Sequence, residues 1–397
     1  MQGMTAFFRH DAAQQSRHKN GSFSLLRQTA HIDFFLFGAA FAISILGLMT
    51  MRSFTIENAF FDKQLIWIVL SIPLFFIVSF GDYSFLRRTR VIVGLYVLTL
   101  AFLLLIFVFG AIVKGSQNRF DLGLFAVQPS DPAKLLLVAL LAKYFARRHI
   151  EIAHIRHILV SGAYAFALFV LVFLQPDFGS GIIIASIWLG MVLVAGISWK
   201  HLAILGITAA VVFAALWTFA LHPYQKQRVM TFIHPLADIR GAGYNAYQSM
   251  IAVGSGEVIG KGVGYGTQSK LQFLPEYQTD FIFAAYAEEW GFVGVVLFLG
   301  LFTIVIVRIL LIAAHGRDNF DTLFAAGIAI YLAAQFMVHV GMNIGLMPIT
   351  GTTLPFMSYG GSHLLTEFLA LGMLMSLRRN ARPVPVARDQ TELIGTV

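Results

Sequence analysis

Asp280 is the residue of this chain whose position most directly indicates a chemical task. It ends a polar run at residues 274–280, Leu-Pro-Glu-Tyr-Gln-Thr-Asp, and a long apolar stretch begins at Phe281. A carboxylate at the entrance to a membrane helix is costly to keep unless it has a partner or a task. Such a group can serve as a general base that takes a proton from an attacking hydroxyl. The structural alternative is that Asp280 caps the helix, where the helix dipole favours a negative charge.

Cationic side chains in the other polar segments extend this chemistry. Guanidinium and ammonium groups supply the counter-charge that a pyrophosphate needs, and a base beside them suits glycosyl transfer from an anionic, lipid-linked donor. Alternatives stay open, because Lys134 could pair with Asp131 on the same helix face and Arg228 could anchor the chain at the membrane interface. The cationic candidates are Lys114, Arg119, Lys134, Arg228 and Lys270.

The composition places these residues in a membrane protein. The 397-residue chain is 58% hydrophobic and 12% charged, whereas a soluble domain is about 45–50% apolar and about 25% charged. The chain has no Cys, which excludes a disulfide framework, a thiolate metal site and a Cys nucleophile. No His-x-x-x-His pair on a helix is present. The sequence leaves open whether a divalent cation, Mg²⁺ or Mn²⁺, helps a pyrophosphate to depart.

The distribution of apolar residues predicts an all-α polytopic fold with about ten transmembrane helices, since one span needs about 20 apolar residues. A long loop, residues 222–280, separates the seventh span from the eighth, and its many glycines favour tight turns and close backbone approach. The expected spans are residues 33–51, 64–81, 91–110, 132–146, 157–174, 179–197, 201–221, 281–313, 322–345 and 361–378.

The positive charges predict an orientation in the membrane. Most of the 28 lysine and arginine residues fall in the tails and short loops of one side, with clusters at residues 86–90 and 146–149. The positive-inside rule places that side in the cytoplasm. A net charge of +8 with this distribution is a topology signal and does not indicate nucleic-acid binding. The expected organisation is a cytoplasmic tail at 1–30, a transmembrane domain at 31–378 that includes the extracytoplasmic loop 222–280, and a cytoplasmic tail at 379–397.

Four polar segments fall on the outer side of the expected membrane. Besides the long loop, they lie within residues 114–134, 175–181 and 343–362, and Gly and Pro mark each of them. Polar, non-helical backbone near membrane depth is tolerated only where protein buries it or a wet cavity receives it. We therefore expect the four segments to surround one outward-facing cavity beside Asp280.

These segments together resemble the SEDS family (shape, elongation, division and sporulation), and within it the RodA branch rather than the FtsW branch. The stretch GTQSKLQFLPEYQTDFIFA is the most specific part of the resemblance, which runs from about residue 114 to residue 362. The matching stretches are QPSDPAK, QPDFGSG, YQKQRVMTFIHP, GAGYNAYQSMIAVGSG, KGVGYGTQSKLQFLPEYQTDFIFAAYAEEWG and LPFMSYGGS.

The resemblance implies a peptidoglycan glycosyltransferase that polymerises lipid II during cell elongation and rod-shape maintenance. The donor would be the growing glycan on undecaprenyl pyrophosphate, and Asp280 would activate the 4-hydroxyl of the acceptor sugar. The resemblance also implies a bacterial cytoplasmic (inner) membrane protein with a class B penicillin-binding protein as partner, beside other elongation-complex proteins. The expected substrate-binding residues are Lys114, Arg119, Lys134, Arg228, Lys270, Glu276 and Ser358.

The chain departs from the family's pattern in places. Asp131 stands where the family has Glu, and the pattern KGAQRW reads KGSQNR here, so that Asn118 falls at the family's Arg and Arg119 at its Trp. His363 follows the YGGS motif and Glu367 lies deeper, where the family is usually apolar. The resemblance assigns no role to either of these two residues.

Two other functions fit the same features. Ten spans with a polar outward cavity also fit a lipid II flippase, although transporters often show inverted repeats and no repeat is visible here. The second alternative is a non-catalytic scaffold of the elongation machinery, whose loop only recruits a partner. An assay of lipid II polymerisation and translocation by the purified chain distinguishes the three functions.

Overall fold

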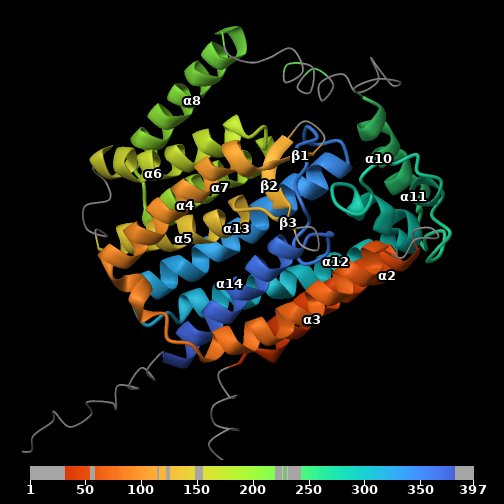
Figure 1. Cartoon of the computed structure of the whole chain (residues 1–397), viewed down its shortest axis with the longest axis horizontal. Coiled ribbons are helices and arrows are strands. Elements are labelled where there is room, and N and C mark those ends of the chain that lie inside the picture. Colours follow the sequence, from red (N-terminus) through yellow and green to blue (C-terminus); the bar gives the residue numbers. More distant parts are fainter. Residues whose placement is uncertain are drawn as a thin grey trace, which may run out of the picture.

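The chain forms a bundle of long helices that lie roughly side by side (Figure 1). The structure is a computed structural model that describes residues 32–53, 59–113, 116–121, 126–147, 155–219, 226, 230 and 243–380. Each of the ten expected spans corresponds to one long helix, which confirms the predicted polytopic fold. These helices are α2 (Phe34–Ser53), α3 (Ala59–Phe80), α4 (Thr89–Phe109), α5 (Ser130–Ala146), α6 (Ile155–Leu174), α7 (Phe178–Ala195), α8 (Trp199–Phe219), α12 (Ile282–Ala314), α13 (Asn319–Asn343) and α14 (Gly361–Asn380).

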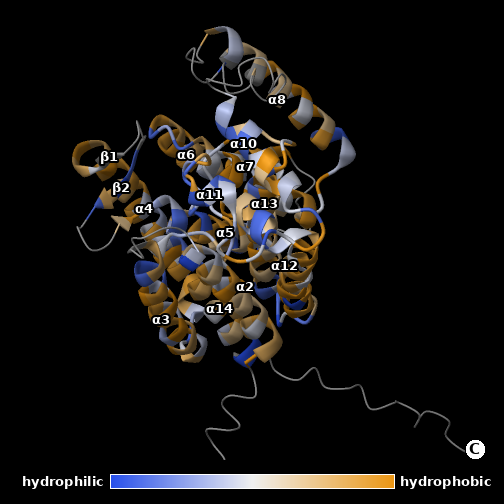
Figure 2. Cartoon of the chain, turned by 90° about the vertical axis from the view of Figure 1, so that its right-hand side faces the viewer, coloured by the Kyte–Doolittle hydropathy of each residue, from blue (hydrophilic) through white to orange (hydrophobic). Residues whose placement is uncertain are grey.

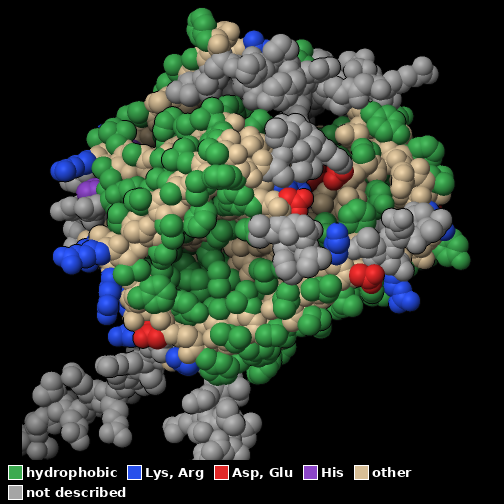
Figure 3. Space-filling model, in the orientation of Figure 1, with side chains coloured by type: hydrophobic (Ala, Val, Ile, Leu, Met, Phe, Trp, Pro, Cys, Tyr) green, Lys and Arg blue, Asp and Glu red, His purple; other side chains and the backbone are tan. Residues whose placement is uncertain are grey.

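Length and composition make this a multi-span membrane protein. Seven of the ten helices are long and apolar enough to cross a membrane within the described residues: α2, α3, α4, α6, α7, α12 and α13. Figure 3 shows hydrophobic side chains over most of one face, with Lys and Arg gathered along its left edge. Positive charges collected at one boundary of an apolar surface are typical of a membrane span's flanks.

α13 lies in the middle of the packing. It packs against α5, α7 and α12, while α14 packs on α3 and α2 packs on α12. In the most apolar 18-residue stretch of each helix, 72% of the residues of α13 are buried, compared with 22% of those of α4. α4 is mostly not covered by other helices, so its apolar side chains are available to contact lipid. α8 stands away from the bundle in two perpendicular views (Figures 1 and 2).

A small antiparallel sheet interrupts the helices between α4 and α5, which the sequence did not predict. It consists of β1 (Ala111–Val113), β2 (Ser116–Asp121) and β3 (Ala126–Val127) in the order β1-β2-β3. Cα pairing joins Ala111 to Arg119 and Phe120 to Val127. Strand pairing satisfies backbone donors and acceptors that would be costly to leave unpaired near membrane depth.

A kink in α12 holds part of the long loop against the bundle. Gly291 has a left-handed φ of 64° inside the helix, a conformation that glycine adopts without steric cost. Four backbone bonds join the loop to the kink, among them those from Lys261 N to Glu288 O and from Phe292 N to Glu257 O, at 3.0 and 2.9 Å. A Cβ on Gly291 would lie 2.2 Å from the Gly260 nitrogen, so the two chains approach too closely for any side chain there.

The side chains of two glutamates in α12 strengthen this attachment. Glu288 is fully buried, forms an ion pair with Lys261 at 2.6 Å and accepts a bond from the Thr267 backbone at 2.9 Å. Glu289 accepts bonds from the Ser53 hydroxyl and from the Gly264 backbone. Because both carboxylates are engaged in this way, they position the loop that contains two short helices, α10 (Tyr244–Ser255) and α11 (Thr267–Lys270).

Candidate functional site

A polar cavity of about 740 Å³ brings together residues from all four outer segments, which confirms the predicted shared cavity. Its wall includes residues of β2, of the turn before α5, of the start of α7, of the loop before α12 and of the 349–363 region. Its polar and charged lining residues include Asn118, Arg119, Gln128, Asp131, Lys134, Asp177, Glu276, Asp280, Gln335, Tyr359, Ser362 and His363.

Asp280 lies on the cavity wall at the end of a compact turn. The carbonyl oxygen of Glu276 accepts backbone bonds from Thr279, Asp280 and Phe281 at 3.1, 3.0 and 3.2 Å. Glu276 itself has a positive φ of 51°, which lets the chain reverse at this point. The turn therefore fixes the backbone of Asp280 before α12 begins.

Two neighbouring elements clamp the same turn from outside. The Asn343 amide, at the end of α13, donates to the Asp280 carbonyl at 3.0 Å and accepts from the Ala284 backbone at 3.2 Å. The Ser358 hydroxyl donates to the Thr279 carbonyl at 2.8 Å. Both Asn343 and Ser358 are buried. The turn that carries Asp280 is thus clamped by two elements that are distant in sequence, as a site that must keep its geometry requires.

Asp280 does not occupy the capping position of α12. The N-cap residue is Phe281, and the helix begins at Ile282. The carboxylate is half-buried and lines the cavity. The alternative prediction, that Asp280 is the N-cap of α12, is therefore wrong.

Lys134 lies in the first turns of α5 with its ammonium beside Asp131. Nζ of Lys134 is 3.2 Å from Oδ1 of Asp131, and both side chains are 5% exposed. The alternative that paired these two residues is confirmed, and Lys134 also lines the cavity. A buried pair of this kind needs further hydrogen bonds to offset its desolvation. The Ser362 hydroxyl provides one by donating to Asp131 at 2.9 Å.

A buried polar network joins this pair to α14 and α13. His363 lies 3.8 Å from Asp131 through Nδ1 and 2.9 Å from Glu367 through Nε2. Glu367 is fully buried and accepts a bond from the Phe356 backbone at 2.8 Å. Nε2 of Gln335, on α13, lies 3.2 Å from Nε2 of His363, the ring nitrogen that also faces Glu367. The unusual His363 and Glu367 therefore belong to the cavity wall and its support.

Asp177 is a helix cap at the cavity wall. Its Oδ1 accepts a bond from the Ser180 backbone at 3.0 Å, at the start of α7. Its Oδ2 accepts from the Gln128 amide at 2.8 Å, which links this turn to the one before α5.

Arg119 reaches the cavity from β2, although the sequence pattern is shifted there. Both Arg119 and its neighbour Asn118 line the cavity, and Nε of Arg119 is 3.4 Å from Oδ1 of Asn118. Tyr359 lines the same wall, and burial raises the pKa of its phenol. The phenol, which is protonated at neutral pH even at its ordinary pKa, can donate a hydrogen bond into the cavity.

The structure separates the remaining predicted substrate-binding residues. Lys270 is exposed outside the cavity, with its ammonium 3.3 Å from the Gly264 carbonyl. Ser358 is buried behind the wall, where it orders the loop: its hydroxyl accepts from the Leu354 backbone at 2.7 Å. Glu276 lies on the wall beside Asp280. Lys114 and Arg228 lie outside the described residues.

The lining suits proton transfer beside an anionic group. It combines the carboxylate of Asp280, whose backbone is held by hydrogen bonds, with two cations, Arg119 and Lys134. Such a carboxylate can accept a proton, and cations nearby can stabilise a departing anion. Within the described residues no group of three or more His, Cys, Asp or Glu side chains is arranged to hold a metal ion.

Known proteins of similar sequence and structure belong to one group. Residues 25–383 match the model of the FtsW, RodA and SpoVE family, described as cell cycle protein. The chain is 38% identical over 288 residues to peptidoglycan glycosyltransferase MrdB of Escherichia coli (strain K12), covering 72% of this chain and 78% of that protein. It is 34% identical over 366 residues to probable peptidoglycan glycosyltransferase FtsW of Hydrogenovibrio crunogenus, covering 88% and 92%. A solved chain from work on structural coordination of polymerization and crosslinking by a peptidoglycan synthase complex has a TM-score of 0.76 at 30% identity, covering 88% of this chain and 98% of that one.

Proposed function

We propose, from the premise that this chain belongs to the FtsW, RodA and SpoVE (SEDS) family and is a peptidoglycan glycosyltransferase, that it polymerises lipid II with Asp280 as the base. The observation that carries the proposal is the position of Asp280. Its backbone is fixed by the Glu276 turn and by Asn343, and its carboxylate lines a polar cavity that also contains two cations.

The proposed reaction joins two lipid-linked sugars in one displacement. The acceptor is lipid II, whose sugar 4-hydroxyl attacks the anomeric carbon of the growing glycan. The bond from that carbon to the undecaprenyl pyrophosphate oxygen breaks as the new glycosidic bond forms, and the hydroxyl proton passes to the Asp280 carboxylate. The pyrophosphate leaves with the electron pair of the broken bond.

Arg119 and Lys134 are the described cations that would stabilise the pyrophosphate in this cavity. Their charges are not equally available, since Lys134 is paired with Asp131 while Arg119 is bonded to the neutral amide of Asn118. Electrostatic stabilisation of a leaving anion is strongest from donors that are held in place before the reaction. Lys114, Arg228 and Lys270 remain predicted contributors from the loops.

We place the enzyme in the RodA branch, acting in cell elongation and rod-shape maintenance with a class B penicillin-binding protein. The sequence motifs favour that branch, and a structural relative comes from a complex in which polymerization and crosslinking are coordinated. The partner's membrane helix would pack against α12 and α13. We further propose that the protein lies in the bacterial cytoplasmic membrane with both tails in the cytoplasm, because the short loops of one side hold most of the positive charge.

A lipid II assay tests this function. The purified chain is incubated with fluorescent lipid II, with and without the partner transpeptidase, and the products are separated on a gel. The proposal predicts glycan polymers, and the variant Asp62→Asn, which removes an exposed acid outside the cavity, should give the same yield.

The same material in vesicles distinguishes the alternatives. Transfer of lipid II between leaflets without polymer would support a flippase. Neither polymer nor transfer by the active partner complex would support a scaffold. Either result would contradict the proposed glycosyltransfer.

A further inference from the structure

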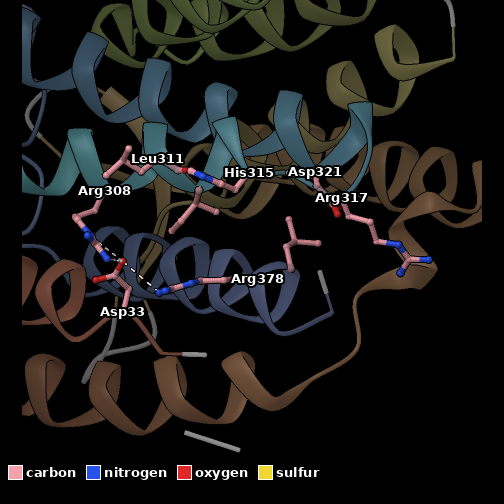
Figure 4. A pocket seen from close by; sticks show the side chains of 10 residues that line it. Asp33, Arg308, Leu311, His315, Arg317, Asp321 and Arg378 are labelled. Atoms are coloured by element: carbon pink, nitrogen blue, oxygen red, sulfur yellow. Dashed lines mark hydrogen bonds and ion pairs between the residues drawn. The ribbon is translucent and has the colours of Figure 1, made fainter. Parts of the chain in front are cut away.

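A second pocket lies at the far end of α12 from Asp280. It has a volume of about 400 Å³ and opens between the start of α2, the end of α12, the start of α13 and the end of α14. Figure 4 shows Asp33, Arg308 and Arg378 grouped at one end of this pocket and Arg317 and Asp321 at the other. None of these residues takes part in the proposed glycosyltransfer.

The charges of this pocket do not cancel. Asp33, which is buried, accepts from Nε of Arg308 at 2.7 Å and lies 3.3 Å from Nη1 of Arg378. Two guanidinium groups therefore share one carboxylate and leave a surplus positive charge. At the other end Arg87, which lies outside the lining, is shared by Asp321 and Asp318, so that Arg317 balances the second carboxylate and the surplus positive charge lies at the Asp33 end.

The walls between these two charged ends are apolar. Leu311, Ile312 and Leu377 line the pocket, and Leu311 is 44% exposed. Phe35 extends the apolar rim, since its ring lies 5.7 Å from Cζ of Arg308 and it is 74% exposed. A ligand for this pocket must therefore offer an anionic group and hydrocarbon at the same time.

We propose that this pocket binds one anionic glycerophospholipid, with its phosphate between Arg308 and Arg378 and its acyl chains along Leu311 and Phe35. Basic pockets between transmembrane helices bind anionic lipid headgroups at the cytoplasmic boundary, which is where the positive-inside rule puts these helix ends. A free phosphate would leave the apolar walls facing water. The N-terminal segment 1–31 is a poor occupant by charge, because its lysines and arginines outnumber its acids.

Lipid binding to the full-length protein in detergent micelles tests the proposal. Phosphatidylglycerol and phosphatidylcholine of the same acyl composition are titrated in turn, and bound lipid is counted by native mass spectrometry. We expect phosphatidylglycerol to bind about thirtyfold more tightly, since each arginine near the headgroup contributes to the affinity for an anionic lipid. The double variant Arg317→Gln/Arg378→Gln should lose this preference.

Controls separate the pocket from general charge and from misfolding. Arg90→Gln removes an exposed arginine of α4 that does not line the pocket, and it should keep the full preference. Arg317→Gln alone leaves both Asp33 pairs intact and should weaken the preference about fivefold. The proposal is wrong if wild-type protein binds both lipids equally, if the double variant keeps the preference, or if free glycerol phosphate binds as tightly as phosphatidylglycerol.

Discussion

The two ends of the helix bundle both place lysine or arginine beside aspartate, but they bury these pairs to different degrees. In the cavity, the side chains of Lys134 and Asp131 are each 5% exposed. At the other end, Asp33 is 2% exposed, whereas its partners Arg308 and Arg378 are 31% and 40% exposed. Water can therefore reach the cations of the second pocket much more easily than the cation of the cavity.

This difference in burial determines how much stability each end loses when one partner of an ion pair is removed. A buried pair loses much of its stability when one partner is removed, because the remaining charge stays in a low-dielectric surrounding. An exposed pair contributes little, because solvent screens it and rehydrates the charge that is left. The fixed geometry of the buried end suits the proposed reaction chemistry, and the solvent access of the other end suits the proposed reversible lipid binding.

The largest loss of stability is expected from Lys134→Met. It leaves the Asp131 carboxylate without its cation, at a cost of about 3–5 kcal/mol in the free energy of unfolding. Lys143→Met makes the same change on the same helix at a less buried position and should cost less than about 0.5 kcal/mol. Denaturation in mixed detergent micelles measures both. Equal losses in the free energy of unfolding would show that the buried Lys134–Asp131 pair stabilises the fold no more than the less buried Lys143 does.

A smaller loss is expected from Glu367→Leu, which deprives the Phe356 amide and His363 of their acceptor. Leaving buried polar groups unsatisfied costs about 1–3 kcal/mol. The double variant His363→Leu/Glu367→Leu should cost less than the sum of the two single variants, because both partners are then removed. The same unfolding assay measures the coupling free energy between the two residues. Strictly additive costs would show that His363 and Glu367 do not interact in the folded protein.

Gly351→Ala should cost about 1–2 kcal/mol, because Gly351 has a left-handed φ of 73° that disfavours any side chain. The new Cβ would lie 3.4 Å from Oδ2 of Asp280, an ordinary contact, so the backbone carries the cost. Gly300→Ala is the matched control, since nothing lies within 4 Å of its Cβ position in α12. If the control lost as much stability as Gly351→Ala, the left-handed backbone would not be the cause.

The smallest effect is expected from Arg308→Gln at the exposed end. Asp33 stays buried but keeps Arg378 as a partner, so no unpaired buried charge is left and the loss should be less than about 1 kcal/mol. Thermal unfolding in detergent without added lipid checks this value. A loss as large as that of Lys134→Met would remove the contrast between the two ends.

The helices could be predicted because they depend on local sequence, and the shared cavity because four polar segments fall on one side of the expected membrane. Each span is a stretch of about 20 apolar residues, and the cap at Asp177 follows from its place directly before α7. The β-sheet was missed because its strands are two to six residues long, too short for an alternating pattern to be recognised.

The wall of the cavity was predicted only in part, because distant contacts decide it. The sequence gives no sign that His363 meets Asp131, which lies on another helix, or that Asn343 clamps the backbone of Asp280. The spacing of His363 and Glu367 by four residues could have indicated a shared helix face. Conversely, Ser358 was expected to touch substrate, but its hydroxyl is occupied by the backbone of Leu354 and Thr279.

The rate of a single glycosyl transfer by Asp280→Asn tests the central proposal most directly. Lipid II binding is measured on the same protein, so that loss of chemistry is distinguished from loss of substrate or of fold. The account predicts that lipid II affinity is kept within a few-fold while the transfer rate falls about 10²–10⁴-fold, the range for removal of a general base. A folded Asp280→Asn protein that transfers at the wild-type rate would contradict the assignment of Asp280 as the base.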